Sequence, residues 1–237
     1  LVPVERCATR SGLAVLADLH LSVPTDKGAN AGAKVTALVA GMVAGADSID
    51  DMALLRHGAM GRVFDRTYAP STLGSFLRAF TFGHVRQLDA VGSRFVTALA
   101  DRTPLVRANP DAQVLLDVDD TIIEVHGHAK QGAGFGYSGV RGLNALLATH
   151  TVTGRAPVII SQRLRKGSAA SPRGAKRLVA DAVQTARRLL GKHQRVLVRM
   201  DSAFFGGPAV RAAVAGGADV SVTVRLTSSI KTAISVI

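Results

Sequence analysis

The sequence has few of the residues that build disulfide-bonded or membrane-spanning proteins. Cys7 is its only cysteine, which excludes an internal disulfide and a cysteine-based zinc cluster and suits a reducing cytoplasm. The longest apolar stretch, Val35 to Ala46, is interrupted by Gly41 and Gly45 and is too short to cross a bilayer. No signal peptide opens the chain, so we expect a soluble protein. The start at Leu1 rather than at a methionine indicates a fragment.

Acidic residues are also scarce, and the resulting positive charge is unevenly distributed. The chain has 29 Lys and Arg against 17 Asp and Glu, a net charge of +12. Residues 1–110 contain 12 basic and 9 acidic side chains, whereas residues 111–237 contain 17 and 8. Such a surplus favours nucleic acid as partner, because neutralising phosphates releases counterions. The alternative is a merely solvated basic face.

The first part of the chain, residues 1–105, predicts a helical domain. Apolar residues recur there at helical spacing, with breaks at Pro24–Gly32, Gly58–Gly61 and Ala69–Pro70. Pro70–Thr72 opens a helix expected at Thr72–Phe80, with exposed polar groups at Ser71, Thr72, Ser75 and Arg78. These groups suit a helix-turn-helix DNA reader, and a plain helical bundle is the alternative.

The second part, residues 111–237, alternates strands and helices after a natural linker at Thr103–Pro110. We expect strands at Val114–Val118, Leu143–Thr151, Pro157–Leu164, Val196–Met200 and Ala218–Leu226, with Ile122–Val125 as a partner or extension of the first. We expect helices from Pro172 to Leu190, ended by Gly191, and at Pro208–Ala215. Gly127–Gly142 contains six glycines and predicts a loop or wide hairpin. An RNase H-like core has this order of elements: several strands, then a helix, a strand, a helix and a strand. The expected fold class is α/β, a helical N-terminal domain before a partial RNase H-like core with a mixed sheet.

Three carboxylates are expected at the exit of the first strand, and one more follows another strand. Alternation puts Asp117 and Asp119 on one face of the strand and Asp120 on the other. Crowded carboxylates favour a bound cation, and Asp201, after the strand that ends at Met200, could join them around Mg²⁺ ions for phosphodiester chemistry. The alternative makes Asp119 and Asp120 turn residues and Asp201 a helix cap.

Several stretches resemble DDE transposases of bacterial insertion sequences, specifically the IS-thirteen-eighty group. They occur in the family's order at Asp117–Thr121, Ala129–Gly139, Leu164–Ser168 and Val198–Phe204. The helical stretches Leu38–Met42 and Thr81–Asp89 are similar too. The resemblance implies a protein of the cytoplasm and nucleoid that binds its element's terminal inverted repeats and target DNA. It also implies that DNA is cut and rejoined with Mg²⁺ or Mn²⁺, and it allows a homodimer in the DNA complex.

The resemblance also assigns the acids. Asp119 matches the family's first catalytic acid, with Asp117 as a possible substitute, and Asp201 matches the second; Asp119 and Asp201 are the expected metal ligands. The third acid, a glutamate, lies further on in the family, and this sequence has no glutamate after Glu124. We therefore expect a C-terminally truncated chain without strand-transfer activity.

Basic and aromatic residues around these acids are the expected DNA contacts of the second domain. They are Arg163, Arg165 and Lys166 on one side, and Lys130, Tyr137 and Arg141 in the glycine-rich loop. His126 and His128 are a weak candidate for a metal site. Two other functions stay open: a DNA-binding remnant that inhibits transposition, and a haloacid dehalogenase-like phosphatase with Asp117 as nucleophile and Asp119 as general acid.

Overall fold

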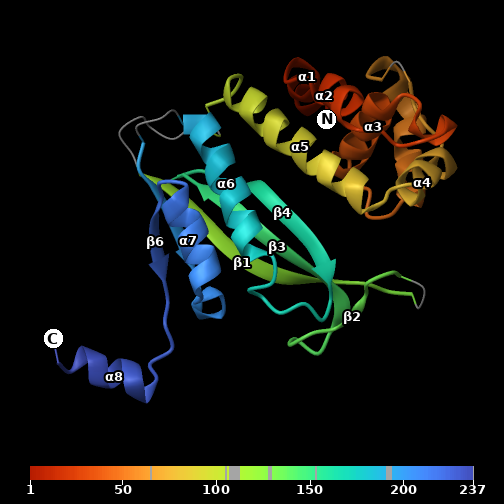
Figure 1. The fold of residues 1–237 in the computed structure, drawn as a ribbon. Helices are drawn as coiled ribbons and strands as arrows, with labels where there is room; N and C mark the ends of the chain where they lie inside the picture. Colours follow the sequence, from red (N-terminus) through yellow and green to blue (C-terminus); the bar gives the residue numbers. More distant parts are fainter. Residues whose placement is uncertain are drawn as a thin grey trace. The chain divides into compact units, whose positions relative to one another are not determined.

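The computed structural model describes residues 1–64, 66–104, 106, 113–127, 130–152, 154–190 and 194–236. The chain divides into two compact units, Leu1–Pro104 and Leu105–Ile237 (Figure 1). Most of the predicted linker, His128 and Gly191 lie outside the described residues. Within the described ranges, no helix is both long enough and apolar enough to cross a membrane.

The first unit is helical throughout its described residues, as its apolar periodicity predicts. Its α-helices are α1 (Val2–Arg10), α2 (Leu13–His20), α3 (Ala31–Val43), α4 (Pro70–Arg78) and α5 (Phe82–Ala100). Its 3₁₀ helices are η1 (Asp26–Gly28), η2 (Asp50–Arg56) and η3 (Gly58–Arg62). The helix expected at Thr72–Phe80 is α4, which ends at Arg78 and begins two residues earlier than expected, at Pro70, because proline fits the first helical position, where no N–H is needed.

Small residues and one capping aspartate hold α2 and α3 together. A Cβ atom added to Gly32 would lie 2.3 Å from the carbonyl oxygen of Ala14, so only glycine allows this close approach. The Gly32 N–H also donates to Asp18 Oδ1 at 2.7 Å. Leu73 and Phe76 of α4 are completely buried in the same core. The apolar face of α4 is thus used for packing within this unit.

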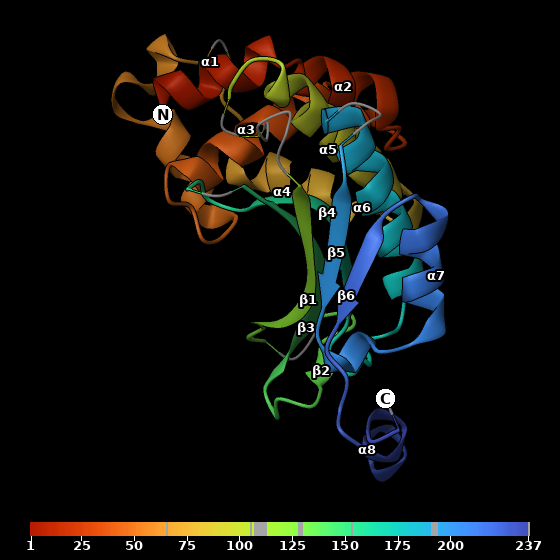
Figure 2. The same ribbon diagram turned by 90° about the vertical axis from the view of Figure 1, so that its left-hand side faces the viewer.

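The second unit contains six described strands and the helices that join them (Figure 2). The strands are β1 (Val114–Glu124), β2 (Gly134–Phe135), β3 (Arg141–Thr151), β4 (Val158–Lys166), β5 (Val196–Met200) and β6 (Asp219–Val222). The helices are α6 (Ala175–Leu190), the 3₁₀ helix η4 (Ser202–Phe204), α7 (Gly207–Ala215) and α8 (Ser228–Ile234).

The sheet of the second unit is mixed, with β1 at its centre. On one side β1 pairs with β5 and β5 with β6, all parallel; on the other side β1 pairs antiparallel with β3, and β3 with β4. The short β2 pairs with the start of β3. Helices α6 and α7 pack together and lie on the same face of the sheet (Figures 1 and 2). This helical and mixed-sheet α/β architecture confirms the predicted fold class.

Of the two alternatives for Ile122–Val125, extension of the first strand is confirmed as far as Glu124, so that β1 is 11 residues long. Some other predicted boundaries in the second unit are wrong. Helix α6 begins at Ala175 rather than at Pro172, because Gly174 has a φ of +83°, which no right-handed helix accommodates. Strand β6 is shorter than expected, and α8 was not predicted.

Candidate functional site

The carboxylates of β1 lie in the middle of the strand and not at its exit, because pairing with β3 continues to Glu124. Their division between two faces is the one that alternation predicts. The apolar residues that share a face with Asp120 are buried on the side covered by α6. Asp117 and Asp119 point to the opposite face. The two faces of β1 therefore have different chemistry.

The register between β1 and β5 brings Asp119 and Asp201 next to each other. Val118 and Met200 are the last paired residues of these parallel strands, and each aspartate follows directly. The backbone of Asp201 is still extended, with φ −80° and ψ 179°. Because Val118 and Met200 are both buried on the α6 side, the two following side chains point to the other face. Neighbouring strands are about 4.8 Å apart, so both carboxylates can reach one ion.

Each of these carboxylates has one oxygen held by the backbone. Asp119 Oδ1 accepts from the Asp120 N–H at 2.8 Å, and Asp201 Oδ1 accepts from the Ala203 N–H at 2.9 Å. Both side chains are exposed, and in the described part of the chain neither forms an ion pair with a basic residue. Oxygen ligands of this kind fit Mg²⁺ or Mn²⁺. Among the described residues no group of three or more potential metal ligands occurs, and metal binding by Asp119 and Asp201 stays a prediction.

Asp117 lies on the same face but is already neutralised. Arg199 of β5 donates to it through Nε at 2.6 Å and through a terminal nitrogen at 2.8 Å, and the Thr151 hydroxyl donates at 2.7 Å. Burial raises the pKa of Asp117, but the hydrogen bonds from Arg199 and Thr151 and the charge of Arg199 outweigh it and lower that pKa below 3.8. A carboxylate bound in this way is a poor substitute for Asp119 as a metal ligand.

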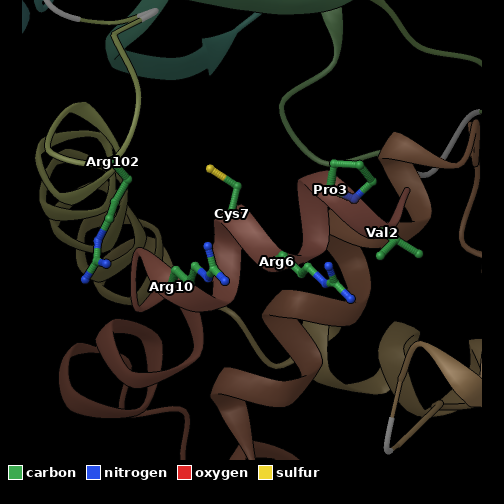
Figure 3. A pocket seen from close by; sticks show the side chains of 6 residues that line it. All are labelled: Val2, Pro3, Arg6, Cys7, Arg10 and Arg102. Carbon is green, nitrogen blue, oxygen red and sulfur yellow. The ribbon is translucent and has the colours of Figure 1, made fainter.

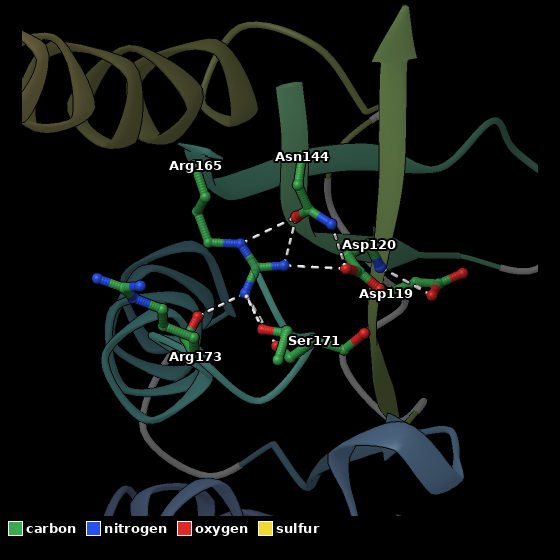
Figure 4. A network of polar contacts seen from close by, with 7 residues as sticks. Asp119, Asp120, Asn144, Arg165, Ser171 and Arg173 are labelled. Carbon is green, nitrogen blue, oxygen red and sulfur yellow. Dashed lines mark hydrogen bonds and ion pairs between the residues drawn. The ribbon is translucent and has the colours of Figure 1, made fainter. Parts of the chain in front are cut away.

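Asp120 belongs to a polar network on the opposite, α6 side of the sheet (Figure 4). Its Oδ2 accepts from Asn144 Nδ2 at 2.5 Å and from Arg165 at 2.9 Å. Arg165 is almost fully buried, with 9% of its side chain exposed, and it also donates to the side-chain oxygen of Asn144. Its third nitrogen donates to the carbonyl oxygens of Ala170, Ser171 and Arg173, in the segment before α6.

The expected DNA contacts on β4 differ in their availability. Arg163 is bound to Asp181 of α6 at 2.5 Å and, like Arg165, points toward the α6 side. Lys166 is exposed at the end of the strand. DNA contact by Arg163 and Arg165 stays a prediction, and their engagement with carboxylates inside the fold does not support it.

In the glycine-rich loop, Lys130 and Tyr137 are exposed, and the Tyr137 side chain lies fully in solvent. Arg141 donates to the carbonyl oxygens of Val125 and Gly127, which ties the loop to the end of β1. Gly167 fits tightly against this loop, because a Cβ there would lie 2.1 Å from the Gly142 carbonyl oxygen. The loop therefore presents Lys130 and Tyr137 outward.

In the first unit, Ser71, Thr72 and Arg78 of α4 are exposed, and Arg78 donates to the partly buried Ser75 at 3.3 Å. They are available for binding, and their contact with DNA stays a prediction.

A cationic hollow of about 380 Å³ lies beside α1 in the first unit (Figure 3). Its lining consists of Val2, Pro3, Arg6, Cys7, Arg10 and Arg102. Arg6 and Arg10 are one helical turn apart, and Arg102 follows α5. In the described part of the chain none of the three arginines forms an ion pair, and no acidic side chain lines the hollow. We call these residues the arginine hollow; its chemistry suits a phosphate group.

Sequence reasoning assigned no role to Arg199, and it assigned Arg165 to DNA rather than to Asp120. Arg199 alternates with the buried residues of β5, so its position opposite Asp117 could have been inferred once the strands were paired. The roles of Asn144 and Arg165 had no such signal. Leu164 lies between Arg163 and Arg165 and is 58% exposed, which reverses the usual rule that the apolar residue of an alternating strand points inward.

Comparisons with known proteins identify the family. The sequence matches the family described as Transposase DDE domain group 1 over residues 31–237. No curated protein matches. Two solved structures, a pre-cleavage Mos1 transpososome and the Mos1 strand transfer complex, are similar at 10% and 11% identity, with TM-scores of 0.30 and 0.28. Each alignment covers 84% of this chain, and it covers 60% and 59% of the respective Mos1 chain. The family match extends over most of both units, and this chain belongs to the DDE transposase domain family, group 1.

Proposed function

We propose that this chain acts in the transposition of a bacterial insertion sequence of the IS-thirteen-eighty group, and that Asp119 and Asp201 are two of its catalytic acids. The observation that carries the proposal is the adjacency of these two exposed carboxylates, which no basic residue of the described chain neutralises. Two like charges so close favour a divalent cation between them.

Asp119 and Asp201 would hold Mg²⁺ or Mn²⁺ through their carboxylate oxygens. The bound ion would polarise a phosphodiester and activate the attacking oxygen for DNA cleavage and strand transfer. The protein's own part is to orient the carboxylates: the N–H groups of Asp120 and Ala203 each fix one oxygen and leave the other for the ion. The Arg199 side chain keeps Asp117 neutralised beside them.

The 237 residues offer no obvious third acid. After Asp201 the only acidic residue is Asp219, which is paired with Arg195 at 2.9 Å on β6. We therefore expect these residues by themselves to bind DNA without strand transfer. Such a protein could occupy the element's ends and inhibit transposition.

Double-stranded DNA, at the terminal inverted repeats and the target, is the proposed partner, and a homodimer the proposed state in the complex. Residues 1–105 would bind DNA through the arginine hollow and the exposed groups of α4. Residues 111–237 would form the catalytic domain and contact the phosphate backbone of the DNA through Lys130, Tyr137 and Lys166. A protein with these roles would act in the cytoplasm, at the nucleoid.

The phosphatase alternative has lost its support. A nucleophilic Asp117 would have to be free to attack phosphorus, whereas both of its oxygens accept hydrogen bonds from Arg199 and Thr151. The family match also gives a different chemistry.

Mn²⁺ titration followed by water-proton relaxation tests the proposed site. Asp119→Asn and Asp201→Asn should each weaken Mn²⁺ binding by at least about tenfold, since even outer-sphere changes cost that much. Asp219→Asn is the matched control, because it removes an aspartate of the same unit that is bound to Arg195. Equal Mn²⁺ affinity in the wild type and both site variants would contradict the proposal.

A further inference from the structure

The buried guanidinium of Arg165 joins four separate segments of the second unit. It contacts Asn144 of β3, Asp120 of β1 and the carbonyl oxygens of the segment before α6, while Arg165 itself belongs to β4. Nε and both terminal nitrogens of the guanidinium donate hydrogen bonds, so each of its three nitrogens is engaged (Figure 4). A planar fork with five N–H groups can satisfy this many acceptors, and a lysine ammonium cannot.

The network continues from Arg165 to the proposed metal site. Arg165 and Asn144 both donate to Asp120 Oδ2, which holds that side chain on the α6 side, where 15% of it is exposed. The backbone N–H of Asp120 donates in turn to Asp119 Oδ1. Rotation of the strand at Asp120 would therefore move the group that orients Asp119.

We propose that Arg165 is a positioning residue for Asp119, and that it acts through Asp120 rather than by binding DNA phosphates. The inference rests on the proposed function, because it assumes that Asp119 binds a divalent ion. Arg165 fixes the side-chain direction of Asp120, and Asp120 presents its N–H so that one oxygen of Asp119 stays free on the opposite face. The same guanidinium ties the entry of α6 to the acidic strand.

Arg163 provides a matched control. It lies two residues away on the same strand, points to the same side and is bound to a carboxylate, but its partner is Asp181 of α6 and not an acid of β1. With 14% of its side chain exposed, it is nearly as buried as Arg165. Any general effect of disturbing the packing between β4 and α6 should appear in both variants.

The test compares Arg165→Lys and Arg163→Lys by Mn²⁺ titration, with circular dichroism to verify folding. Arg165→Lys should weaken Mn²⁺ binding by about tenfold, as loss of an outer-sphere partner does, and Arg163→Lys should change it less than about twofold. In the Asp119→Asn background, Arg165→Lys should have no further effect, because the two residues act on the same ligand. If Arg165→Lys does not fold, Asp120→Asn, which keeps the side-chain shape, should give the same loss.

Three results would overturn the inference. The first is an unchanged Mn²⁺ affinity in folded Arg165→Lys, and the second is an equal loss of Mn²⁺ affinity in Arg163→Lys. The third is a decrease of about one unit in the slope of log DNA affinity against log salt in Arg165→Lys, which would make Arg165 a phosphate contact. Failure of the proposed function looks different, because Asp119→Asn itself would then leave Mn²⁺ binding unchanged.

Discussion

On the open face of the second unit, the register of β1 and β5 sets two kinds of residue pair side by side. Asp117 lies opposite Arg199, and this pair is neutral because the guanidinium binds both carboxylate oxygens. Asp119 and Asp201 each directly follow the last paired residue of their strand, and neither forms an ion pair with a basic residue of the described chain. The first pair links the two strands, and the second is the proposed site for a divalent cation.

The Asp117 ion pair should make the stability of the second unit depend on pH. The pKa of Asp117 in the folded protein lies below its ordinary value of 3.8, so the unfolded chain binds the proton more readily. The stabilisation is therefore present above about pH 4 and is lost as the pH falls through the lower, folded-state pKa.

We expect Asp117→Asn to reduce the free energy of unfolding by about 0.5–1 kcal/mol at pH 7, a small value because both partners are more than a third exposed. In urea unfolding at progressively lower pH, the difference between wild type and variant should shrink as Asp117 becomes protonated. Asp219→Asn, whose partner Arg195 is more exposed, should have a smaller effect at pH 7. A difference that persists at low pH would mean that Asp117 acts through packing.

At the scale of elements, strand and helix periodicity predicted most of the fold, and its errors have local causes. β5 begins and ends as predicted, because an apolar run bounded by polar residues marks a buried strand. The predicted start of α6 was wrong. Ser171 and Pro172 are typical of the first residues of a helix, but in the structure the segment before α6 is bound to Arg165, which donates to the carbonyl oxygens of Ser171 and Arg173. No pattern of neighbouring residues reveals a contact made across the sheet.

The candidate site was also predictable in part. Asp119 and Asp201 could be named because each follows an apolar run, and the resemblance gave their order. The Arg165 network could not be found, because it requires a charged residue to be buried where alternation favours Leu164. Pairing with Asp120 and the hydrogen bonds to Asn144 and to backbone carbonyl oxygens make such burial tolerable.

The beginning of α6 gives a prediction for one glycine. Gly174 has a φ of +83°, a conformation that costs an L-residue about 1–2 kcal/mol, and it directly precedes the helix. Gly174→Ala should therefore lower the free energy of unfolding by about 1 kcal/mol, measured in urea. The control is Gly92→Ala in α5, where no atom lies near an added Cβ and the helical backbone should gain up to about 1 kcal/mol. If both variants were stabilised, the left-handed turn before α6 would not be required.

At the scale of the whole molecule, the charge and the candidate site reside mainly in the same half of the chain. Residues 111–237 carry 17 basic and 8 acidic side chains, yet Arg163, Arg165 and Arg199 are engaged with aspartates. If the chain binds DNA as proposed, the attraction must therefore come from other, exposed cations. In the first unit, whose total charge is smaller, three arginines line the arginine hollow, and none of them forms an ion pair in the described part of the chain. The arginine hollow is therefore a candidate phosphate site that net charge alone does not indicate.

Cys7 makes binding in the arginine hollow measurable, because it lines the hollow and is the only cysteine of the chain. Bound duplex DNA should slow the alkylation of Cys7 by iodoacetamide, and added salt should restore the rate, since phosphate contacts release counterions. Arg6→Gln with Arg10→Gln should remove this protection and lower the slope of log affinity against log salt by about two units. The control, Arg56→Gln with Arg62→Gln, changes the charge of the same unit equally at exposed positions outside the hollow. An alkylation rate that DNA leaves unchanged at low salt, or equal slopes in the two double variants, would place the phosphate contacts of this unit elsewhere.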